Sequence, residues 1–370
     1  MRWLIGCSDR AARSDVLLMP HPRISFILAT HNRRDVLLNT LERVKETGLN
    51  HHAFEVIVVD NASSDGTATA VRDRFPDVIL MALARNRGSC AKGLAIDSAK
   101  GEYIVFLDDD SFPRAGSIER MIERFEDDDK LGAAGFVVHL PDGSRECSAF
   151  PNVFIGCGVG LRASALRSVG GLDVDLFMQA EEYDLSFRLV NAGWQVETFD
   201  DLHVDHLKTN RARIGARTTY FDTRNNLMLA DRYLSPPYRR IYRRDWLERY
   251  RWLASMNRHT RSFARGLAAA TLRSRSNSRR YADKKLNPEA FETLFRLAYV
   301  RSRMEALRAN GVSRVVLADL GKNVYAFFRG ATQSGLTVLA IADGLLFSFF
   351  RPSPVWIKLW RSGLFVLLSV

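Results

Sequence analysis

Short apolar runs and amphipathic segments alternate along the first half of the chain. The apolar runs are rich in branched and aromatic residues and have the length of buried strands, whereas the segments between them show helical spacing. We expect strands at residues 24–29, 54–59, 78–83 and 103–107, and helices at residues 34–47, 67–74 and 88–99. This alternation predicts an α/β fold whose mostly parallel sheet is flanked by helices on both faces.

The pattern continues, less regularly, through the middle of the chain. Helices are expected at residues 118–126, 163–169 and 181–192, and strands at residues 133–140 and 194–199. A basic and largely helical stretch follows at residues 238–272, and we expect the polar run at residues 274–280 to break it. The α/β pattern therefore gives way to a region of different character.

Residues 313–343 show strand, turn, helix and strand patterns in that order. This order is typical of part of a dinucleotide-binding βαβ unit, although only Gly321 of the expected glycines is in place. We predict four segments: an N-terminal extension (1–22), an α/β domain (23–230), a basic helical region (231–312) and a partial Rossmann-like βαβ unit with a truncated end (313–370).

Positive charge is concentrated in one segment. The chain has 370 residues and a net charge of +11, whereas residues 208–285 hold 21 Lys and Arg against 5 Asp and Glu, a net charge of +16. The remainder is net negative, at −5. We expect an anionic partner for the basic segment, either a membrane surface or a phosphate-bearing substrate, and no nucleic acid.

Two patterns bear on the compartment. No apolar stretch reaches the roughly 18 residues that a membrane-spanning helix needs, and the N-terminus lacks the features of a secretory signal. The four cysteines form no CxxC pair, which fits a reducing compartment. We expect a cytoplasmic location, with peripheral attachment to the inner face of the cell membrane as an alternative.

Tyr238, Tyr242, Trp246 and Tyr250 recur every four residues among many arginines. This spacing predicts an amphipathic helix with an aromatic stripe. The stripe has two interpretations that the sequence leaves open. It packs against the α/β domain, or it enters the interface of an anionic membrane while the arginines meet lipid phosphates.

Three aspartates follow the strand at residues 103–107 directly. Asp108, Asp109 and Asp110 would repel one another at the carboxyl end of a strand unless a cation or hydrogen-bond donors lie among them. Mg²⁺ and Mn²⁺ prefer such oxygen ligands and often complete their coordination with substrate phosphates. A solvated acidic turn is the alternative, and residues 127–129 show the same composition after a helix.

Five motifs occur in order: ATHNR (29–33), VVDNASSDGT (58–67), ARNRG (84–88), FLDDD (106–110) and EEYDLSFRL (181–189). Together they resemble the family 2 glycosyltransferases, which have the GT-A fold. The resemblance covers about residues 23–230. It implies a donor site for a nucleoside diphosphate sugar and a divalent cation, Mg²⁺ or Mn²⁺.

The resemblance also implies roles for individual residues. The nucleotide-sugar-binding residues would be Thr30, Arg33, Asp60, Asn86, Arg87, Asp108 and Asp109. The metal ligands would be Asp110 and His206. The general base would be Glu182, where the family more commonly has Asp. The acceptor side would include Gly158, Arg162, Glu181 and Arg224.

The resemblance implies an inverting glycosyltransferase that moves a sugar from a UDP or dTDP donor to a glycan or lipid-linked acceptor. Two alternatives remain open. A nucleotidyltransferase would use similar carboxylates, but the chain lacks a Gly-rich phosphate loop after its first strand. A non-catalytic nucleotide-sugar-binding or membrane-adaptor protein would bind the donor without transferring the sugar.

Overall fold

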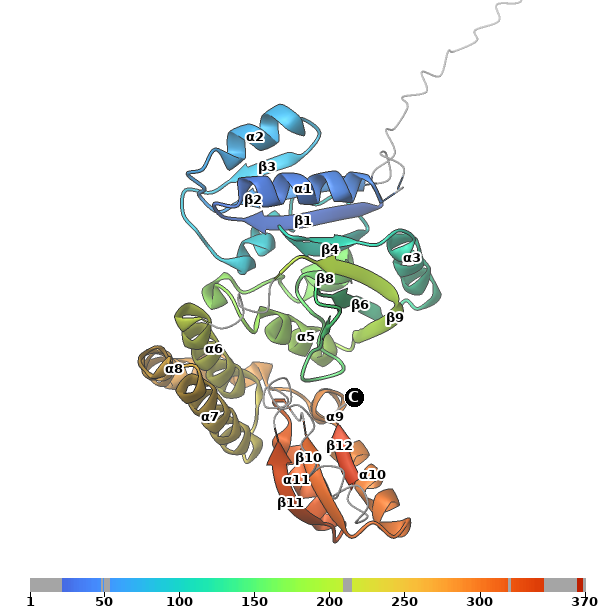
Figure 1. The fold of residues 1–370 in the computed structure, drawn as a ribbon, viewed down its shortest axis with the longest axis vertical. Coiled ribbons are helices and arrows are strands. Elements are labelled where there is room, and N and C mark those ends of the chain that lie inside the picture. Colours follow the sequence, from blue (N-terminus) through green and yellow to red (C-terminus); the bar gives the residue numbers. More distant parts are fainter. Residues whose placement is uncertain are drawn as a thin grey trace, which may run out of the picture.

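The computed structural model describes residues 22–47, 49, 54–208, 215–318, 321–342 and 365–368. Nearly all of the predicted extension lies outside these residues. The described part of the chain forms a sheet domain, a layer of long helices beside it and a smaller C-terminal unit (Figure 1). The predicted boundary at residue 230 falls within a helix, α6 (Ala216–Tyr233), rather than in a linker.

A nine-stranded mixed sheet organises the first domain, in the order β3-β2-β1-β4-β8-β6-β9-β5, with β7 paired to β6. Its strands are β1 (Ile24–Thr30), β2 (Phe54–Asp60), β3 (Ile79–Ala82), β4 (Tyr103–Asp108), β5 (Ser111–Pro113), β6 (Leu131–His139), β7 (Arg145–Glu146), β8 (Gly158–Arg162) and β9 (Gln195–His206). The first four strands in this order are parallel, whereas β8 runs antiparallel to β4 and β6. The α/β fold class is thus confirmed, with the strictly parallel arrangement limited to one half of the sheet.

Each face of the sheet buries its own core. Ile27 and Phe106 point into one core and Leu28 and Leu107 into the other, because neighbouring residues of a strand face opposite sides. Helices cover both faces: α1 (Arg34–Lys45), α2 (Thr67–Arg74), α3 (Ser117–Asp127), α4 (Ala163–Ser168) and α5 (Glu181–Asn191). The sheet therefore has covered faces, and its carboxyl-terminal edge is where functional side chains gather.

The helix predicted at residues 88–99 is a short 3-10 helix, η1 (Ser89–Ala95). Its first turn bonds both to itself and to a neighbouring loop: the amide of Ala91 donates to the carbonyl of Gly88 at 3.1 Å, and the amide of Cys90 donates to the carbonyl of Phe177 at 3.2 Å. Gly88, at φ +72°, allows this approach, because a Cβ there would lie 2.0 Å from the Phe177 oxygen. A shorter 3-10 helix packed against this loop thus replaces the expected helix.

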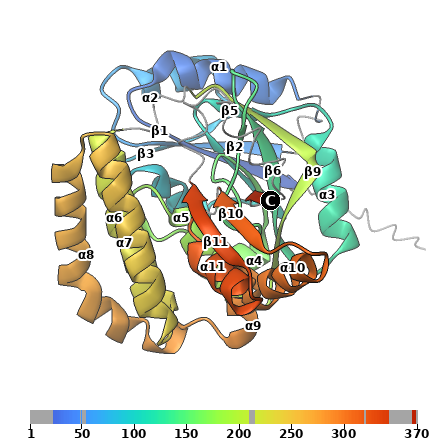
Figure 2. The same ribbon diagram turned by 60° about the horizontal axis from the view of Figure 1, so that its bottom comes forward.

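The basic region forms three helices: α6, α7 (Tyr238–Met256) and α8 (Thr260–Arg280), which lie side by side in Figures 1 and 2. The predicted break at residues 274–280 is wrong, because that run continues α8 and buries Asn277. The break falls at residues 257–259 instead, where Arg258 has a left-handed backbone with φ +59°. Two antiparallel helices replace the one that was expected.

The aromatic stripe of α7 faces the interior. Tyr242, Trp246 and Tyr250 are 0%, 1% and 5% exposed and join the core that also contains α5. Core packing is confirmed, and these aromatic rings are not available to a membrane interface.

The C-terminal unit follows two short helices, α9 (Pro288–Phe295) and α10 (Leu297–Ala309). Its strands β10 (Arg314–Ala318), β11 (Thr337–Ala342) and β12 (Phe365–Leu368) form a parallel sheet in the order β11-β10-β12, and α11 (Val324–Gln333) connects the first two. The predicted strand–helix–strand pattern is present, with a third strand added. Among the helices described, none combines the length and the apolarity required to cross a bilayer.

Candidate active site

Three aspartates lie at the carboxyl end of β4, in the middle of the sheet. Asp109 and Asp110 are buried, and Asp108 is partly exposed. A turn leads directly from β4 into β5, so all three carboxylates are held at one edge. Burial raises the pKa of Asp109 to about 6, while Arg33 and Thr30 oppose this rise. The cluster is therefore stable only with the cationic and donor groups around it.

A buried lysine balances the first aspartate. Lys92 on η1 is 3% exposed, and its Nζ donates to Asp108 Oδ1 at 2.9 Å. The same ammonium donates to the carbonyls of Gly156 at 2.8 Å and Leu107 at 3.3 Å. Burial disfavours the ammonium, but Asp108 outweighs burial and raises the pKa of Lys92. Lys92 is thus a permanently charged partner of the acidic turn.

The ATHNR motif supplies the partners of the other two aspartates. The Arg33 guanidinium donates to Asp109 Oδ1 at 2.6 Å and to Asp110 Oδ2 at 2.8 Å. The hydroxyl of Thr30 donates to Asp109 Oδ2 at 2.7 Å. Thr30 and Arg33 were both predicted to be near the donor, and the structure brings them onto the acidic turn itself.

Pairing of β5 with β9 brings a histidine to the same turn, since Ser111 lies opposite His206. His206 Nε2 is 3.0 Å from Asp110 Oδ1, and Cys157 Sγ is 3.3 Å from His206 Nδ1. Burial disfavours the imidazolium, but the hydrogen bonds to Asp110 and Cys157 raise the pKa of His206 to about 10.

The residues present fit a divalent cation. Asp108, Cys157 and His206 each offer one ligand atom, and these atoms lie within 4.8 Å of one another. Asp110 adds a carboxylate beside His206. Carboxylate and imidazole donors suit Mn²⁺, and the thiol is the softest member of the set.

The predicted nucleotide-binding loops lie at the same edge of the sheet. Asp60 ends β2 opposite Thr30 and accepts the amide of Ser63 at 3.0 Å. Asn61 joins this loop to the next one, because its side chain accepts the amide of Arg87 at 3.0 Å and donates to the carbonyl of Gly88 at 3.1 Å. The side chain of Asn86 accepts the amide of Gly88 and so shapes its own turn.

The first turn of α5 carries two glutamates. Glu181 accepts a short hydrogen bond from the hydroxyl of Ser89, and its other carboxylate oxygen is buried without a hydrogen-bond partner among the described residues. Burial and the neighbouring Glu181 raise the pKa of Glu182 to about 8, and Lys322 opposes this rise. Glu181 also influences Lys92, which links the α5 terminus electrostatically to the acidic turn.

Asp184, one turn further along α5, has a structural role. It accepts hydrogen bonds from Arg188 at 2.8 Å, Tyr233 at 2.6 Å and Arg232 at 3.0 Å. These bonds tie α5 to α6, which fixes the direction in which the glutamates of the first turn point.

Two residues predicted on the acceptor side are placed differently. Arg162 lies opposite Tyr103 at the far end of β4, and its guanidinium donates to the carbonyls of Leu131, Phe125 and Asp128. This arginine does not join the acidic cluster. The sequence located Arg162 along the chain but did not show that β8 runs antiparallel to β4, which places Arg162 at the end of β4 away from the aspartates.

Arg224 is buried on α6 and donates to the carbonyls of Asp175 at 3.0 Å and Leu176 at 2.7 Å. Its neighbour Asn225 donates to the carbonyls of Leu176, Met178 and Gln179. These side chains hold the loop before α5. The Arg224 guanidinium therefore binds backbone carbonyls and supports the site indirectly.

Gly158 lies opposite Leu107 at the end of β4, close to the acidic turn. A Cβ at this position would lie 2.9 Å from Val204, so the glycine permits close packing of β8 against β9. Sequence reasoning missed Lys92, Cys157 and Asn61. Only Asn61, which lies within the VVDNASSDGT motif, carried a signal that could have identified it.

Part of the sheet domain is similar to known glycosyltransferases. Residues 25–158 match the model of glycosyl transferase family 2. A poly-beta-1,6-N-acetyl-D-glucosamine synthase of Staphylococcus aureus (strain MSSA476) is 34% identical over 113 residues, 30% of this chain and 27% of that protein. TuaG of Bacillus subtilis (strain 168), a glycosyltransferase assigned to teichuronic acid biosynthesis, is 27% identical over 153 residues, 37% of this chain and 60% of that protein. The chain thus spans about a quarter of the first relative.

Two solved structures show the same fold. S. aureus TarS 1-349 in complex with UDP-GlcNAc superposes with a TM-score of 0.50 at 12% identity, covering 85% of this chain and 92% of that one. GalNAc-T7 with UDP, GalNAc and Mn²⁺ gives a TM-score of 0.50 at 12% identity, covering 70% and 58%. The fold and its acidic edge define an α/β protein of the GT-A class. Within its first domain, the match to glycosyl transferase family 2 runs from β1 to the start of β8.

Replacement of the buried lysine tests the charge balance of the turn. We expect Lys92→Met to lower the free energy of unfolding by about 2 kcal/mol, because Asp108 loses its partner and two carbonyls lose a donor. Water reaches the partly exposed Asp108 and limits the loss. Chemical denaturation measures the difference. Lys100→Met, at an exposed position, is the control, and equal stability of both variants would contradict the role assigned to Lys92.

Proposed function

We propose that the protein is a metal-assisted, inverting glycosyltransferase that uses a nucleoside diphosphate sugar, with UDP or dTDP as the nucleotide. The observation that supports this proposal most directly is that η1 joins the acidic turn to the glutamates of α5. Lys92 Nζ donates to Asp108 Oδ1 at 2.9 Å, and the hydroxyl of Ser89 donates to Glu181. One side is suited to a diphosphate with its cation, and the other to an acceptor hydroxyl.

The donor would lie along the strand ends. In this proposal Asp60, Asn86 and Arg87 contact the nucleotide or its diphosphate, while Asp108 and Asp109 face the ribose or sugar. Asp110 and His206 hold Mg²⁺ or Mn²⁺, with Asp108 and Cys157 close enough to contribute. When bound, the cation supplies Lewis-acid stabilisation of the departing diphosphate.

The acceptor would be activated by Glu182. A general base removes the proton of the acceptor hydroxyl as its oxygen attacks the anomeric carbon from the face opposite the diphosphate, which inverts that carbon. Burial and Glu181 raise the pKa of Glu182 to about 8, which lies near the operating range of a base. The related proteins named for cell-surface glycans favour a glycan or lipid-linked acceptor.

The metal site can be tested by an isosteric change. We expect Asp110→Asn to abolish the Mn²⁺-dependent rise in melting temperature that UDP or dTDP sugars cause in the wild type, because one anionic ligand is lost. A thermal-shift panel of nucleoside diphosphate sugars, with and without Mn²⁺, measures this. Asp127→Asn, in the exposed acidic run, is the matched control. Metal-dependent donor binding that survives in Asp110→Asn would refute this ligand assignment.

The base can be tested separately from binding. We expect Glu182→Gln to lower sugar transfer by at least about 100-fold while donor binding stays within twofold, since only proton removal is lost. Wild-type turnover should rise with pH up to about 8, because only the ionised carboxylate accepts a proton. Glu119→Gln on α3 is the control. Unchanged turnover in Glu182→Gln would assign the base elsewhere, and donor binding without transfer in the wild type would favour the binding-protein alternative.

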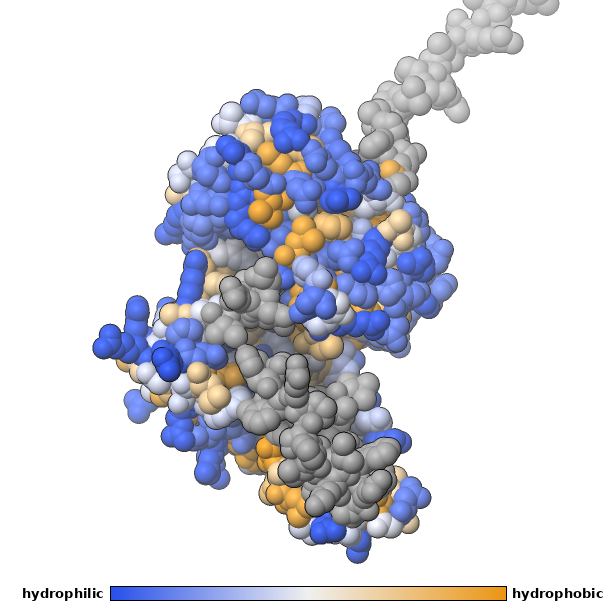
Figure 3. Space-filling model, viewed as in Figure 1, coloured by the Kyte–Doolittle hydropathy of each residue, from blue (hydrophilic) through white to orange (hydrophobic). Residues whose placement is uncertain are grey.

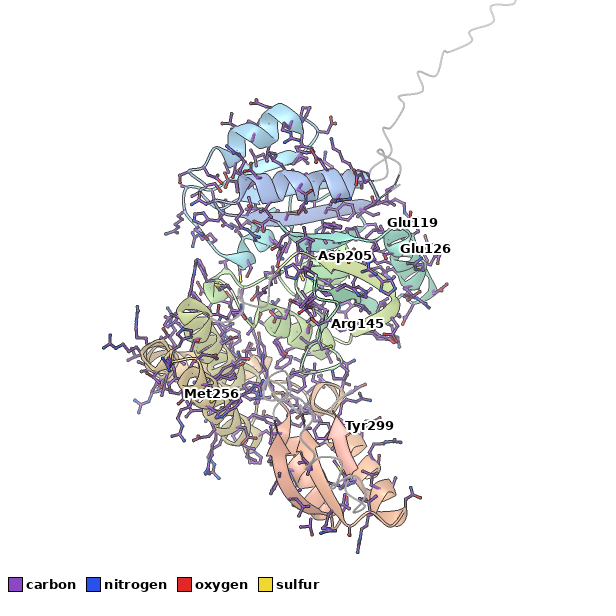
Figure 4. The ribbon with its side chains drawn as sticks, viewed as in Figure 1. Glu119, Glu126, Arg145, Asp205, Met256 and Tyr299 are labelled. Atoms are coloured by element: carbon purple, nitrogen blue, oxygen red, sulfur yellow. The ribbon has the colours of Figure 1, made fainter. Side chains whose placement is uncertain are left out.

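The outer side of α8 suits an anionic membrane surface, and we propose peripheral attachment there. Arg261, Arg265, Arg275 and Arg279 are exposed at helical spacing. Leu272, on the same stripe, is 84% exposed, and Met256 at the end of α7 is 60% exposed (Figure 4). Figure 3 shows a largely hydrophilic surface over this helical layer. Such a mixture of arginines with single apolar side chains favours lipid phosphates over a second protein surface.

Vesicle sedimentation tests this attachment. We expect binding to vesicles rich in phosphatidylglycerol at low salt, and a loss of about tenfold or more in the double variant Arg265→Gln, Arg275→Gln, since each arginine near the surface contributes roughly 1 kcal/mol. The control is Arg72→Gln with Arg303→Gln, at exposed positions of α2 and α10. Binding that is equal for both double variants, or absent in the wild type, would exclude α8 as the contact.

A further inference from the structure

Residues 321–323, just before α11, dock onto α7 and α9. Trp246 Nε1 on α7 donates to the carbonyl of Lys322 at 2.7 Å. Tyr242 Oη donates to Asn323 Oδ1 at 2.8 Å, and Asn323 Nδ2 donates to the carbonyl of Phe295 at 2.8 Å. Asn323 is 6% exposed, so these bonds are shielded from water. Lys322 and Asn323 are therefore fixed against these helices by hydrogen bonds.

Close packing against Ala149 also holds Gly321, just before Lys322. Gly321 has φ +53°, and a Cβ there would lie 2.7 Å from the Cβ of Ala149. The amide of Ala149 donates to the hydroxyl of Tyr183, the residue after Glu182. In a dinucleotide-binding unit, the loop after the first strand would receive a phosphate. Here Gly321 packs against Ala149 of the first domain, and Asn323 is bonded to α7 and α9.

This docking places the Lys322 side chain beside the first turn of α5, which carries the proposed general base Glu182. Its Nζ lies 3.3 Å from the centre of the Tyr183 ring, on the first turn of α5. An ammonium above an aromatic face is held there by the ring quadrupole. The charge of Lys322 is thus placed beside the backbone that carries Glu182.

The surroundings of Glu182 are otherwise acidic. Glu181 precedes it on α5, and the charges of Glu181 and of Asp222 on α6 both raise the pKa of Glu182. Burial raises the pKa of Tyr250 on α7, and Asp222 and Glu182 add to this rise. The positive charge of Lys322 lowers the pKa of Glu182, and it also lowers the pKa of Asp222. Arg249 and Lys208 act on Asp222. A buried group of carboxylates of this kind requires a nearby cation to hold more than one negative charge.

We propose that the C-terminal unit completes the active site, with Lys322 as a positioning residue that supplies the positive charge beside Glu182. The inference rests on the proposed function, because it concerns the base of that reaction. The partial βαβ unit then has a defined role that needs no nucleotide of its own. The unit places the ammonium of Lys322, from a separate part of the chain, on the acceptor side.

The test measures Glu182 directly as well as turnover. Protein labelled with ¹³C at the glutamate side-chain carboxyl is titrated, and the Glu182 resonance is the one lost in Glu182→Gln. We expect Lys322→Gln to raise its titration midpoint by about one pH unit, because an opposing charge is removed. Sugar transfer below that midpoint should fall about tenfold and recover at higher pH. Lys322→Arg retains the charge and should keep the wild-type profile, as should the exposed control Lys130→Gln.

Each result has a separate meaning. An unmoved Glu182 midpoint in Lys322→Gln would overturn the proposal, and so would a loss of transfer that is uniform across pH. A profile of Lys322→Arg that matches Lys322→Gln would also overturn it, because the charge would then not matter. Absence of transfer from the wild type under all donors would instead refute the proposed function, whatever the midpoint does.

Discussion

The mutual repulsion of three carboxylates at the end of β4 is the constraint on which the rest of the structure depends. Asp108, Asp109 and Asp110 are tolerated there because cations reach them from different elements: Lys92 from η1, Arg33 from the turn before α1 and His206 from the end of β9. Each cation fixes the element that carries it. The same charge balance that stabilises the fold therefore gathers the side chains of the proposed donor site.

A second set of contacts fixes the glutamates of α5. Arg232 and Tyr233 of α6 bind Asp184, while Arg224 and Asn225 hold the carbonyls of the loop before α5. That loop has left-handed residues at Phe177, Gln179 and Ala180, a backbone that L-residues rarely adopt without support. The position of the α5 glutamates thus depends on α6, a helix beyond the sheet. The basic region is part of the site's framework as well as a charged surface.

Local pattern predicted much of the fold, because strand and helix periodicities are short-range properties. β1, β2, β4, α2 and α5 lie within a residue or two of their expected bounds. The failures coincide with tertiary contacts. The 3-10 helix at residues 89–95 bonds to the carbonyl of Phe177, and α8 continues through its polar run, where Asn277 is buried. Neither contact has a signal in the nearby sequence.

The motifs by themselves determined which residues stand at the strand ends, since a strand's carboxyl end follows directly from where its apolar run stops. Thr30, Asp60 and the three aspartates could be found in this way. Only the tertiary structure decided which charges meet. Lys92, Cys157 and Lys322 enter the site from segments without motifs, whereas Arg162 and Arg224 are turned toward backbone carbonyls. The reason is physical: charge pairing depends on side-chain direction and burial, which strand register and helix packing set.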